Sequence, residues 1–223
     1  MPPASNKNRT LKTRILGRDG TKRVDVNQLK PGWVATVLAA LVLAAMLITP
    51  AARADNGTWL GNSGNWSAPG TWSGDTVADG ADFTAFFTGI NITAAKTITI
   101  DTARTIGNIT FTDDTTSSHN LTIFGANILT LDATSGAPLI DVTQSGRTLT
   151  ISSQIAGDDG LTKNGVGSTL VLGSANSYTG TTTVNAGTLA FTSTSPFAST
   201  TGITLADTAT LRSDVAGASI GAP

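Results

Sequence analysis

The chain has 223 residues, of which 14 are lysine or arginine, 15 are aspartate or glutamate and none is cysteine. The missing cysteine excludes disulfide bonds and metal sites built from thiolates. Beyond residue 54, five basic residues stand against thirteen aspartates and no glutamate, a formal charge of −8, so nucleic acid and anionic lipid are not expected partners.

The N-terminal 54 residues have the composition of an export signal, an extended basic region followed by an apolar run. The apolar run, 33–48, has 16 residues and is soon followed by Pro50, whereas a helix that crosses a bilayer needs about 20 residues. The small residues Ala52 and Ala54 fit a signal-peptidase site, so we predict cleavage between Ala54 and Asp55. An uncleaved membrane anchor is the alternative. The basic residues that precede the apolar run are Lys7, Arg9, Lys12, Arg14, Arg18, Lys22, Arg23 and Lys30.

Residues 55–89 form the next segment, which is rich in tryptophan and lacks a repeat period. Trp59, Trp66 and Trp72 lie six or seven residues apart among glycine, asparagine and serine. Two roles fit these rings. They would close the N-terminal end of a repeat structure as an apolar plug, which a solenoid needs for solubility, or they would stack on the sugar rings of an extracellular glycan. We expect the plug.

Short apolar runs recur about every ten residues between residues 90 and 157. Such runs, bounded by turn residues, predict β-strands. Their spacing fits the turns of a β-helix and also an antiparallel sandwich, and periodicity alone does not separate the two. The runs are 98–100, 106–111, 121–124, 128–131, 139–142 and 149–151.

The stretch 160–189 places short apolar strands between glycines and Thr/Asn turns. It opens with Gly-Leu-Thr-Lys, continues through Thr-Leu-Val-Leu and Asn-Ser-Tyr-Thr-Gly, and ends with Thr-Thr-Val-Asn-Ala-Gly-Thr-Leu. Strands this short bury an apolar face only against similar strands above and below, as in a solenoid. We expect its glycines, Gly173 included, to take the positive φ of tight corners. The residues expected to shape corners and turns are Gly160, Gly165, Gly167, Asn176, Tyr178, Gly180 and Gly187.

This stretch resembles the autotransporter-associated β-strand repeat, with Ser168 standing as one extra residue. The segment 55–89 is similar, more loosely, to the segment that often precedes such repeats. The resemblance implies an all-β fold, a parallel and right-handed β-helix, in the passenger of a bacterial surface or secreted protein. The repeat pattern is architectural and implies no catalytic, cofactor-binding or metal-binding residue. An autotransporter also needs a membrane barrel, and we expect that translocator to lie outside this chain.

The last stretch, 191–223, holds weaker apolar runs at 203–205 and Leu211 and shows no sign of a cap. A solenoid that stops without a cap leaves unpaired backbone groups at its edge. We therefore expect edge-to-edge self-association, or a chain that is a truncated part of a longer protein. The β-helix region is assigned to 90–223.

Two aspartate pairs suit a calcium site at a corner, because carboxylates and turn carbonyls bind that ion. They are Asp113-Asp114 and Asp158-Asp159. Aspartate is also an ordinary turn residue, and the spacing of calcium-binding nonapeptide repeats is absent. We therefore expect no metal.

A polysaccharide-degrading enzyme on a β-helix needs acids that converge on one face. Asp101, Asp132 and Asp141 lie in neighbouring apolar runs, but acids on an outward face are usually solvated, so we name no catalytic residue. The only histidine, His119, lies in a polar turn where we expect it to be solvated. Beyond residue 54, five asparagines stand in Asn-x-Ser/Thr, and we interpret them as turn or ladder residues. They are Asn56, Asn65, Asn91, Asn108 and Asn120.

The sequence thus predicts a non-catalytic β-helix passenger or stalk that is exported, lies in the medium or on the cell surface, and serves adhesion or display. The alternative is a carbohydrate-binding module that uses Trp59, Trp66 and Trp72, and a polysaccharide-degrading enzyme ranks third. The expected partners are an extracellular glycan or the surface of a host or neighbouring cell. No cofactor is expected.

Overall fold

A computed structural model describes residues 54–89, 91–113, 119–218 and 220, together with the backbone of 15–16 and 23–24. The chain divides into two compact units, Met1–Ala51 and Ala52–Pro223. In the first unit, β1 (Ile15–Leu16) pairs antiparallel with β2 (Arg23–Val24). The rest of the predicted signal peptide lies outside the described residues. None of the helices in the described part of the chain has the length and apolar character that crossing a membrane requires.

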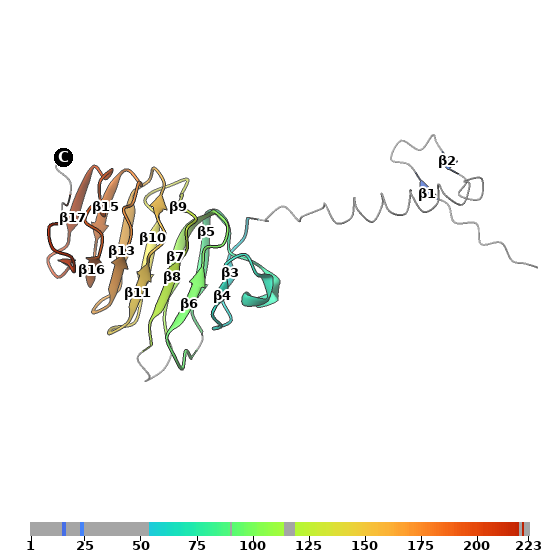
Figure 1. Cartoon of the computed structure of the whole chain (residues 1–223), viewed down its shortest axis with the longest axis horizontal. Coiled ribbons are helices and arrows are strands. Elements are labelled where there is room, and N and C mark those ends of the chain that lie inside the picture. Colours follow the sequence, from blue (N-terminus) through green and yellow to red (C-terminus); the bar gives the residue numbers. More distant parts are fainter. Residues whose placement is uncertain are drawn as a thin grey trace, which may run out of the picture. The chain divides into compact units, whose positions relative to one another are not determined.

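The second unit contains two sheets whose strands stack side by side along the chain (Figure 1). The first sheet has nine strands, with β12-β9-β7-β10-β13-β15-β17 as its main order and β5 joining β3 to β7. Its strands are β3 (Gly57–Thr58), β5 (Gly80–Phe87), β7 (Arg104–Phe111), β9 (Leu129–Leu131), β10 (Leu139–Val142), β12 (Ile155–Ala156), β13 (Leu161–Asn164), β15 (Thr181–Val184) and β17 (Gly202–Leu205).

The second sheet has seven strands in the order β18-β16-β14-β11-β8-β6-β4. Its strands are β4 (Gly64–Asn65), β6 (Lys96–Thr99), β8 (Leu121–Phe124), β11 (Thr148–Ile151), β14 (Thr169–Leu172), β16 (Thr188–Phe191) and β18 (Thr210–Ser213). Two short 3-10 turns, η2 (Pro69–Thr71) and η3 (Ser73–Asp75), lie between β4 and β5.

All strand pairs within these two sheets are parallel. The chain passes back and forth between the two sheets, with β9 and β10, and again β12 and β13, as consecutive strands of the first sheet. This path makes a β-solenoid of about six turns. The predicted parallel β-helix is therefore confirmed, and the antiparallel sandwich left open by the spacing is excluded. Its right-handedness stays a prediction. The predicted apolar runs coincide with β6 to β11.

The core consists of apolar columns that run through successive turns. In the second sheet Leu121, Leu149, Leu170 and Leu189 occupy equivalent positions, and each is fully buried. Burying one such side chain contributes about 1.5–3 kcal/mol. Because every second residue of each strand points inward, the short strands together build a continuous core. The column ends at Leu211, which is only half-buried.

Asparagine side chains join consecutive turns by hydrogen bonds to the backbone. Asn56 Oδ1 accepts a hydrogen bond from the Thr84 amide at 2.6 Å. Asn120 Oδ1 accepts one from the Thr148 amide at 3.0 Å. Since buried or edge-lying amides need partners, these carboxamides stabilise the stack. They agree with the interpretation of the Asn-x-Ser/Thr motifs as turn and ladder residues.

Glycines form the corners of the repeat. Gly165 has φ +105, and a Cβ atom there would lie 1.8 Å from the Val142 carbonyl oxygen, so no other residue fits without moving the backbone. The expectation of positive φ is wrong for Gly173, which instead leaves room for Ser152, whose Oγ would lie 2.8 Å from a Cβ. It is right for Gly160, Gly165, Gly167, Gly180 and Gly187.

Candidate functional site

Three tryptophan rings and Phe87 fill the N-terminal end of the solenoid. Trp59, Trp66 and Trp72 are each at most 1% exposed. The centroid of the Trp66 ring lies 5.2 Å from that of Trp72 and 5.7 Å from that of Phe87. Such tilted and edge-on contacts are the geometry that aromatic rings prefer. These four residues form the tryptophan cap, so the cap predicted for the N-terminal end of the solenoid is present.

Each indole N–H of the cap has a backbone acceptor. Trp59 Nε1 donates to the Asn62 carbonyl at 2.9 Å and Trp66 Nε1 to the Ala78 carbonyl at 2.8 Å. Trp72 Nε1 donates to the Trp66 carbonyl at 2.7 Å. Because the ring faces are buried and the donors are used, this arrangement is that of a plug and presents no indole face to a sugar ring.

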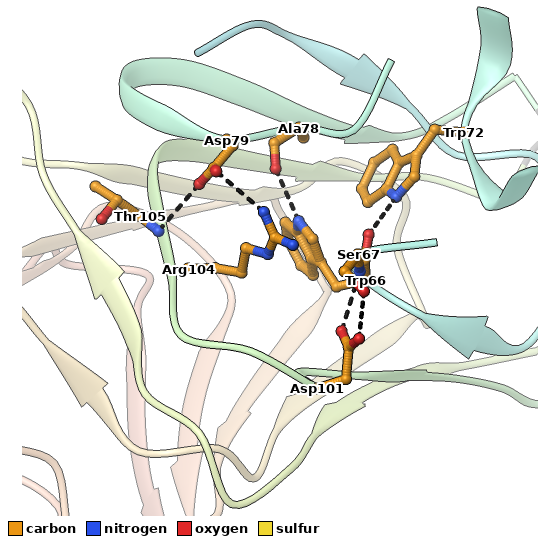
Figure 2. A network of polar contacts seen from close by, with 8 residues as sticks. All are labelled: Trp66, Ser67, Trp72, Ala78, Asp79, Asp101, Arg104 and Thr105. Atoms are coloured by element: carbon orange, nitrogen blue, oxygen red, sulfur yellow. Dashed lines mark hydrogen bonds and ion pairs between the residues drawn. The ribbon is translucent and has the colours of Figure 1, made fainter. Parts of the chain in front are cut away.

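Charged side chains fasten the cap to the turns beneath it, as Figure 2 shows. Both the amide of Ser67, at 3.0 Å, and its hydroxyl donate to the Asp101 carboxylate. Arg104 Nη1 lies 3.0 Å from Asp79 Oδ2 in an ion pair. Burial raises the pKa of Asp101, but the hydrogen bonds from Ser67 outweigh it and hold that pKa below its ordinary value. Asp101, considered above as a catalytic acid, therefore holds the cap in place.

The cap also closes the edge of the first sheet. The backbones of Asp55 and Asp79 exchange two hydrogen bonds, at 2.8 and 3.1 Å, and Trp59 forms an antiparallel bridge with Trp72. β3 therefore has β5 on one side and the 72–79 segment on the other. Cleavage between Ala54 and Asp55 stays a prediction, and it would make Asp55 the first residue of this closed edge.

The repeat contains a buried lysine that the sequence analysis did not single out. Lys163, in β13, is fully buried, and its neighbours in the adjacent strands are Ile140 and Val184. Desolvation lowers the pKa of Lys163 to about 8, against the attraction of Asp141, which raises it. The signal was present in the strand pattern, since Lys163 shares the inward-facing parity of the buried Leu161.

The ammonium group of Lys163 is held by four oxygen acceptors. Three are backbone carbonyls and one is a hydroxyl, and one of the carbonyls belongs to the following turn. Since a buried charge needs hydrogen-bond partners, this cage makes Lys163 a clamp on the corner after β13. The acceptors are the carbonyls of Asn164 at 2.7 Å, Gly165 at 3.3 Å and Ala186 at 3.0 Å, and Ser168 Oγ at 3.1 Å.

Ser168 is an integral part of this corner. It stood as one extra residue in the repeat pattern, but its side chain is 1% exposed. Its Oγ accepts from Lys163 and donates to the Gly165 carbonyl at 2.8 Å. The insertion therefore lengthens the corner by a residue whose hydroxyl completes the lysine cage.

Asn176 and Tyr178 brace the next corner of the repeat. Asn176 is nearly buried, its Oδ1 accepts from the Ile155 amide at 2.9 Å, and its Nδ2 donates to the Pro196 carbonyl at 3.2 Å. The Tyr178 hydroxyl lies 2.7 Å from Thr182 Oγ1. Burial raises the pKa of Tyr178 to about 12. Asn176 thus joins the turn before it to the turn after it.

Residues 161–191 match the family described as Passenger-associated-transport-repeat. The chain carries an autotransporter passenger repeat. The matched range runs from the first residue of β13 to the last residue of β16. It therefore includes the whole lysine cage and also Asn176, whose partners Ile155 and Pro196 lie just outside the match.

The chain is also similar, over a longer stretch than the repeat, to a protein named as an autotransporter. The Adhesin BmaC autotransporter of Brucella suis biovar 1 (strain 1330) is 33% identical over 172 residues, which cover 71% of this chain and 5% of the relative. The chain thus spans a small part of the length of that adhesin. No solved structure matches the chain.

Two of the four aspartates considered for calcium, Asp113 and Asp159, instead make contacts between turns. Asp113 is buried and forms an ion pair with Arg147, whose Nε lies 3.5 Å from Asp113 Oδ2. Asp159 Oδ2 accepts from the Ala133 amide at 3.1 Å. Asp114 lies outside the described residues. Within 54–89, 91–113, 119–218 and 220, no three His, Cys, Asp or Glu side chains are grouped as metal ligands.

The acids considered for catalysis stand on different parts of the solenoid turn. Asp101 follows β6, Asp132 follows β9, and Asp141 lies within β10. Burial raises the pKa of Asp141 above its ordinary value, although the positive charge of Lys163 opposes the shift. His119 lies just before β8 and is half-buried. The fold does not assemble these side chains into one site.

The low pKa of Lys163 predicts that the folded passenger repeat becomes more stable as pH rises from 8 towards 10. Between the folded pKa of about 8 and the ordinary lysine pKa of 10.5, the unfolded chain binds a proton that the folded chain lacks, so the free energy of unfolding increases with pH. We expect a gain on the order of 2 kcal/mol, measured by denaturant unfolding at several pH values.

Above pH 10 the gain reverses, because the pKa of Tyr178 is raised to about 12 and the folded chain then retains a proton that the unfolded chain has lost. Lys163→Met is the control, since it removes the titrating group and with it the rise. A stability that stays flat from pH 8 to 10 in the wild-type chain would contradict the prediction.

Proposed function

We propose that this chain is a non-catalytic segment of an exported adhesive protein, in which the β-solenoid carries contact surfaces away from the cell. The passenger repeat and the relative named as an adhesin support a place on the cell surface or outside the cell. The basic and apolar N-terminal region supports export through a cleaved signal peptide.

The observation that carries the proposal is the use of polar side chains within the solenoid. Asn176 joins successive turns, Lys163 clamps a corner, and Asp101 fastens the cap. Each of these side chains stabilises the stack, and within the described residues no three His, Cys, Asp or Glu side chains are grouped as metal ligands. A stack so constructed is suited to hold a shape rather than to turn over a substrate.

The stack also suits the task of a spacer. The second sheet has seven strands, and adjacent strands lie about 4.7–4.9 Å apart, so every added turn extends the structure by that fixed step. The acidic composition beyond residue 54 keeps the outer surface hydrated and limits non-specific contact with anionic surfaces.

Surface display tests the adhesive role. Residues 55–223 attached to a non-adhesive bacterium through an unrelated outer-membrane anchor are expected to raise attachment to host cells several-fold above the anchor alone. The matched control is an unrelated β-solenoid of similar length, displayed at equal density, which provides the same spacing without this surface. Equal attachment by the two would refute adhesion by these turns.

Residues 55–223, incubated with polysaccharides, also test the two alternative functions, carbohydrate binding and polysaccharide degradation. Polysaccharides that stack on the tryptophan cap would shift the indole emission, and we expect no shift because the rings are buried. We also expect no release of new reducing ends from the polysaccharides. Either signal would favour a carbohydrate-binding or carbohydrate-degrading role over the proposed one.

A further inference from the structure

Asp55, at the closed edge of the first sheet, lies directly opposite a second aspartate. The Asp55 amide donates to the Asp79 carbonyl at 2.8 Å, and the Asp79 amide donates to the Asp55 carbonyl at 3.1 Å. In such an antiparallel pair the two side chains lie on the same face, with their Cβ atoms about 4.5–5.5 Å apart. Like charges in this arrangement repel each other, so the bridge favours a positive charge beside it.

The chain before Asp55 has a defined path out of the tryptophan cap. Ala54 is exposed and lies directly against Gly80, where an added Cβ would be 2.6 Å from Ala54 Cβ. Gly80 also has φ +106, a conformation that other residues rarely adopt. The folded cap therefore accepts a residue before Asp55 while the Asp55–Asp79 bridge is in place.

Cleavage between Ala54 and Asp55 changes the group that donates to Asp79. Hydrolysis breaks this peptide bond, water adds its oxygen to the Ala54 carbonyl carbon, and the two protons of that water pass to the Asp55 nitrogen. The nitrogen that lies 2.8 Å from the Asp79 carbonyl thereby becomes an α-ammonium with two more N–H donors and a positive charge. Hydrogen bonds from a charged donor are roughly twice as strong as neutral ones.

We propose that removal of the signal peptide completes the N-terminal cap, because the new α-ammonium of Asp55 binds Asp79 through the Asp79 carbonyl and carboxylate. This inference rests on the cleaved signal peptide of the proposed function. The charged groups that the structure places at the bridge are the carboxylates of Asp55 and Asp79 and the guanidinium of Arg104, which lies 3.0 Å from Asp79 Oδ2 (Figure 2).

The balance of these groups favours the charged form of the terminal amine. Arg104 opposes the ammonium, while the Asp79 carbonyl and both carboxylates stabilise it, so folding raises the pKa of the α-amino group. The added stability is therefore complete below the ordinary pKa of a terminal amine and is lost as the pH rises through the raised value. The exported chain gains a fastening that its precursor lacks.

N-terminal sequencing and titration of the exported full chain test the proposal in two steps. Sequencing is expected to return Asp55 as the first residue, and another start would overturn both this inference and the cleavage on which it rests. Competitive labelling with an amine reagent then measures the pKa of the α-amino group. We expect this group to bind its proton about three- to tenfold more tightly than an ordinary terminal amine. An ordinary affinity in a chain that begins at Asp55 would overturn the fastening alone and leave the proposed export and adhesion standing.

An insertion moves the ammonium away from the bridge. With Gly-Ser inserted between Ala54 and Asp55, the processed chain begins two residues earlier, and the Asp55 nitrogen is again an uncharged amide. We expect its terminal amine to titrate normally and its unfolding equilibrium constant at pH 7 to be about three- to tenfold larger than that of the native chain. Equal stability of the two chains would contradict the proposal.

A charge substitution identifies the acid that binds the terminal amine. Asp79→Asn keeps an acceptor for Arg104 and Thr105 but removes the negative charge, so it is expected to abolish most of the rise in the pKa of the amine. Asp207→Asn is the matched control, since Asp207 is an exposed aspartate in the corner between β17 and β18, and it is expected to leave that pKa unchanged. Equal effects of the two substitutions would show that Asp79 is not the partner and would overturn the proposal.

Discussion

Replacing Trp66 by alanine is expected to lower the free energy of unfolding by about 3–5 kcal/mol, the usual cost of removing a large buried aromatic side chain. Trp66 is fully buried and contacts the rings of both Trp72 and Phe87. Its indole also donates to the Ala78 carbonyl, which would lose its partner beneath the cap. Denaturant unfolding followed by far-ultraviolet circular dichroism measures the loss.

Leu60→Ala is the matched control for this substitution. Leu60 lies in the same segment but is 49% exposed, so its truncation is expected to change stability by less than about 0.5 kcal/mol. A loss below about 1 kcal/mol for Trp66→Ala would show that the cap does not hold the N-terminal end of the solenoid together.

The loss of stability caused by Trp66→Ala is expected to be confined to the turns next to the tryptophan cap. Each turn of a solenoid contacts only its neighbours, so its stability is a sum of local terms. Asp101 and Arg104 connect the cap to the turns that contain β6 and β7, and those turns lose their fastening first. The turn that contains β16 lies far along the stack and keeps its own core, since Leu189 and Phe191 remain buried against their neighbours.

The strands and the buried face were predictable from the sequence, because inward and outward residues alternate along each strand. The same alternation places Lys163 beside Leu161 on the inward face, and Arg147 on the inward face with Leu149. A charged side chain is usually exposed to solvent, but Lys163 and Arg147 are buried because their positions face inward. A buried basic residue was therefore readable in the pattern, although its acceptors were not.

Contacts between turns were not predictable, because the length of each turn varies along the chain. Asp82 has φ +65, an unusual conformation for a residue other than glycine. Its carboxylate accepts from both the amide and the hydroxyl of Thr134 at 2.7 Å, 52 residues away. The backbone of Asp82 packs directly against Gly107, where a Cβ would lie 2.5 Å from Asp82 Cα. Nothing in the local sequence of β5 indicates that Asp82 pairs with a residue 52 positions further along the chain.

Gly165→Ala is expected to destabilise the passenger repeat by about 3 kcal/mol or more. The left-handed backbone strains an alanine by about 1–2 kcal/mol, and displacing packed atoms costs about 1–3 kcal/mol further. The added methyl would lie 1.8 Å from the Val142 carbonyl oxygen and 2.7 Å from Ser168 Oγ. Because the Gly165 carbonyl accepts from Lys163 and Ser168, any shift of this corner also opens the lysine cage.

Gly136→Ala separates backbone strain from the contact with the neighbouring turn. Gly136 has φ +75, similarly left-handed, but a Cβ there meets nothing within 4 Å. In the same unfolding experiment, Gly136→Ala is therefore expected to lower the free energy of unfolding by the backbone strain alone, about 1–2 kcal/mol. If the two alanines cost the same, Gly165 would be required by its φ alone. A larger loss at Gly165 means that the corner glycine of the repeat is required because the preceding turn passes directly against it, which is the condition for stacking repeats at the spacing of a β-sheet.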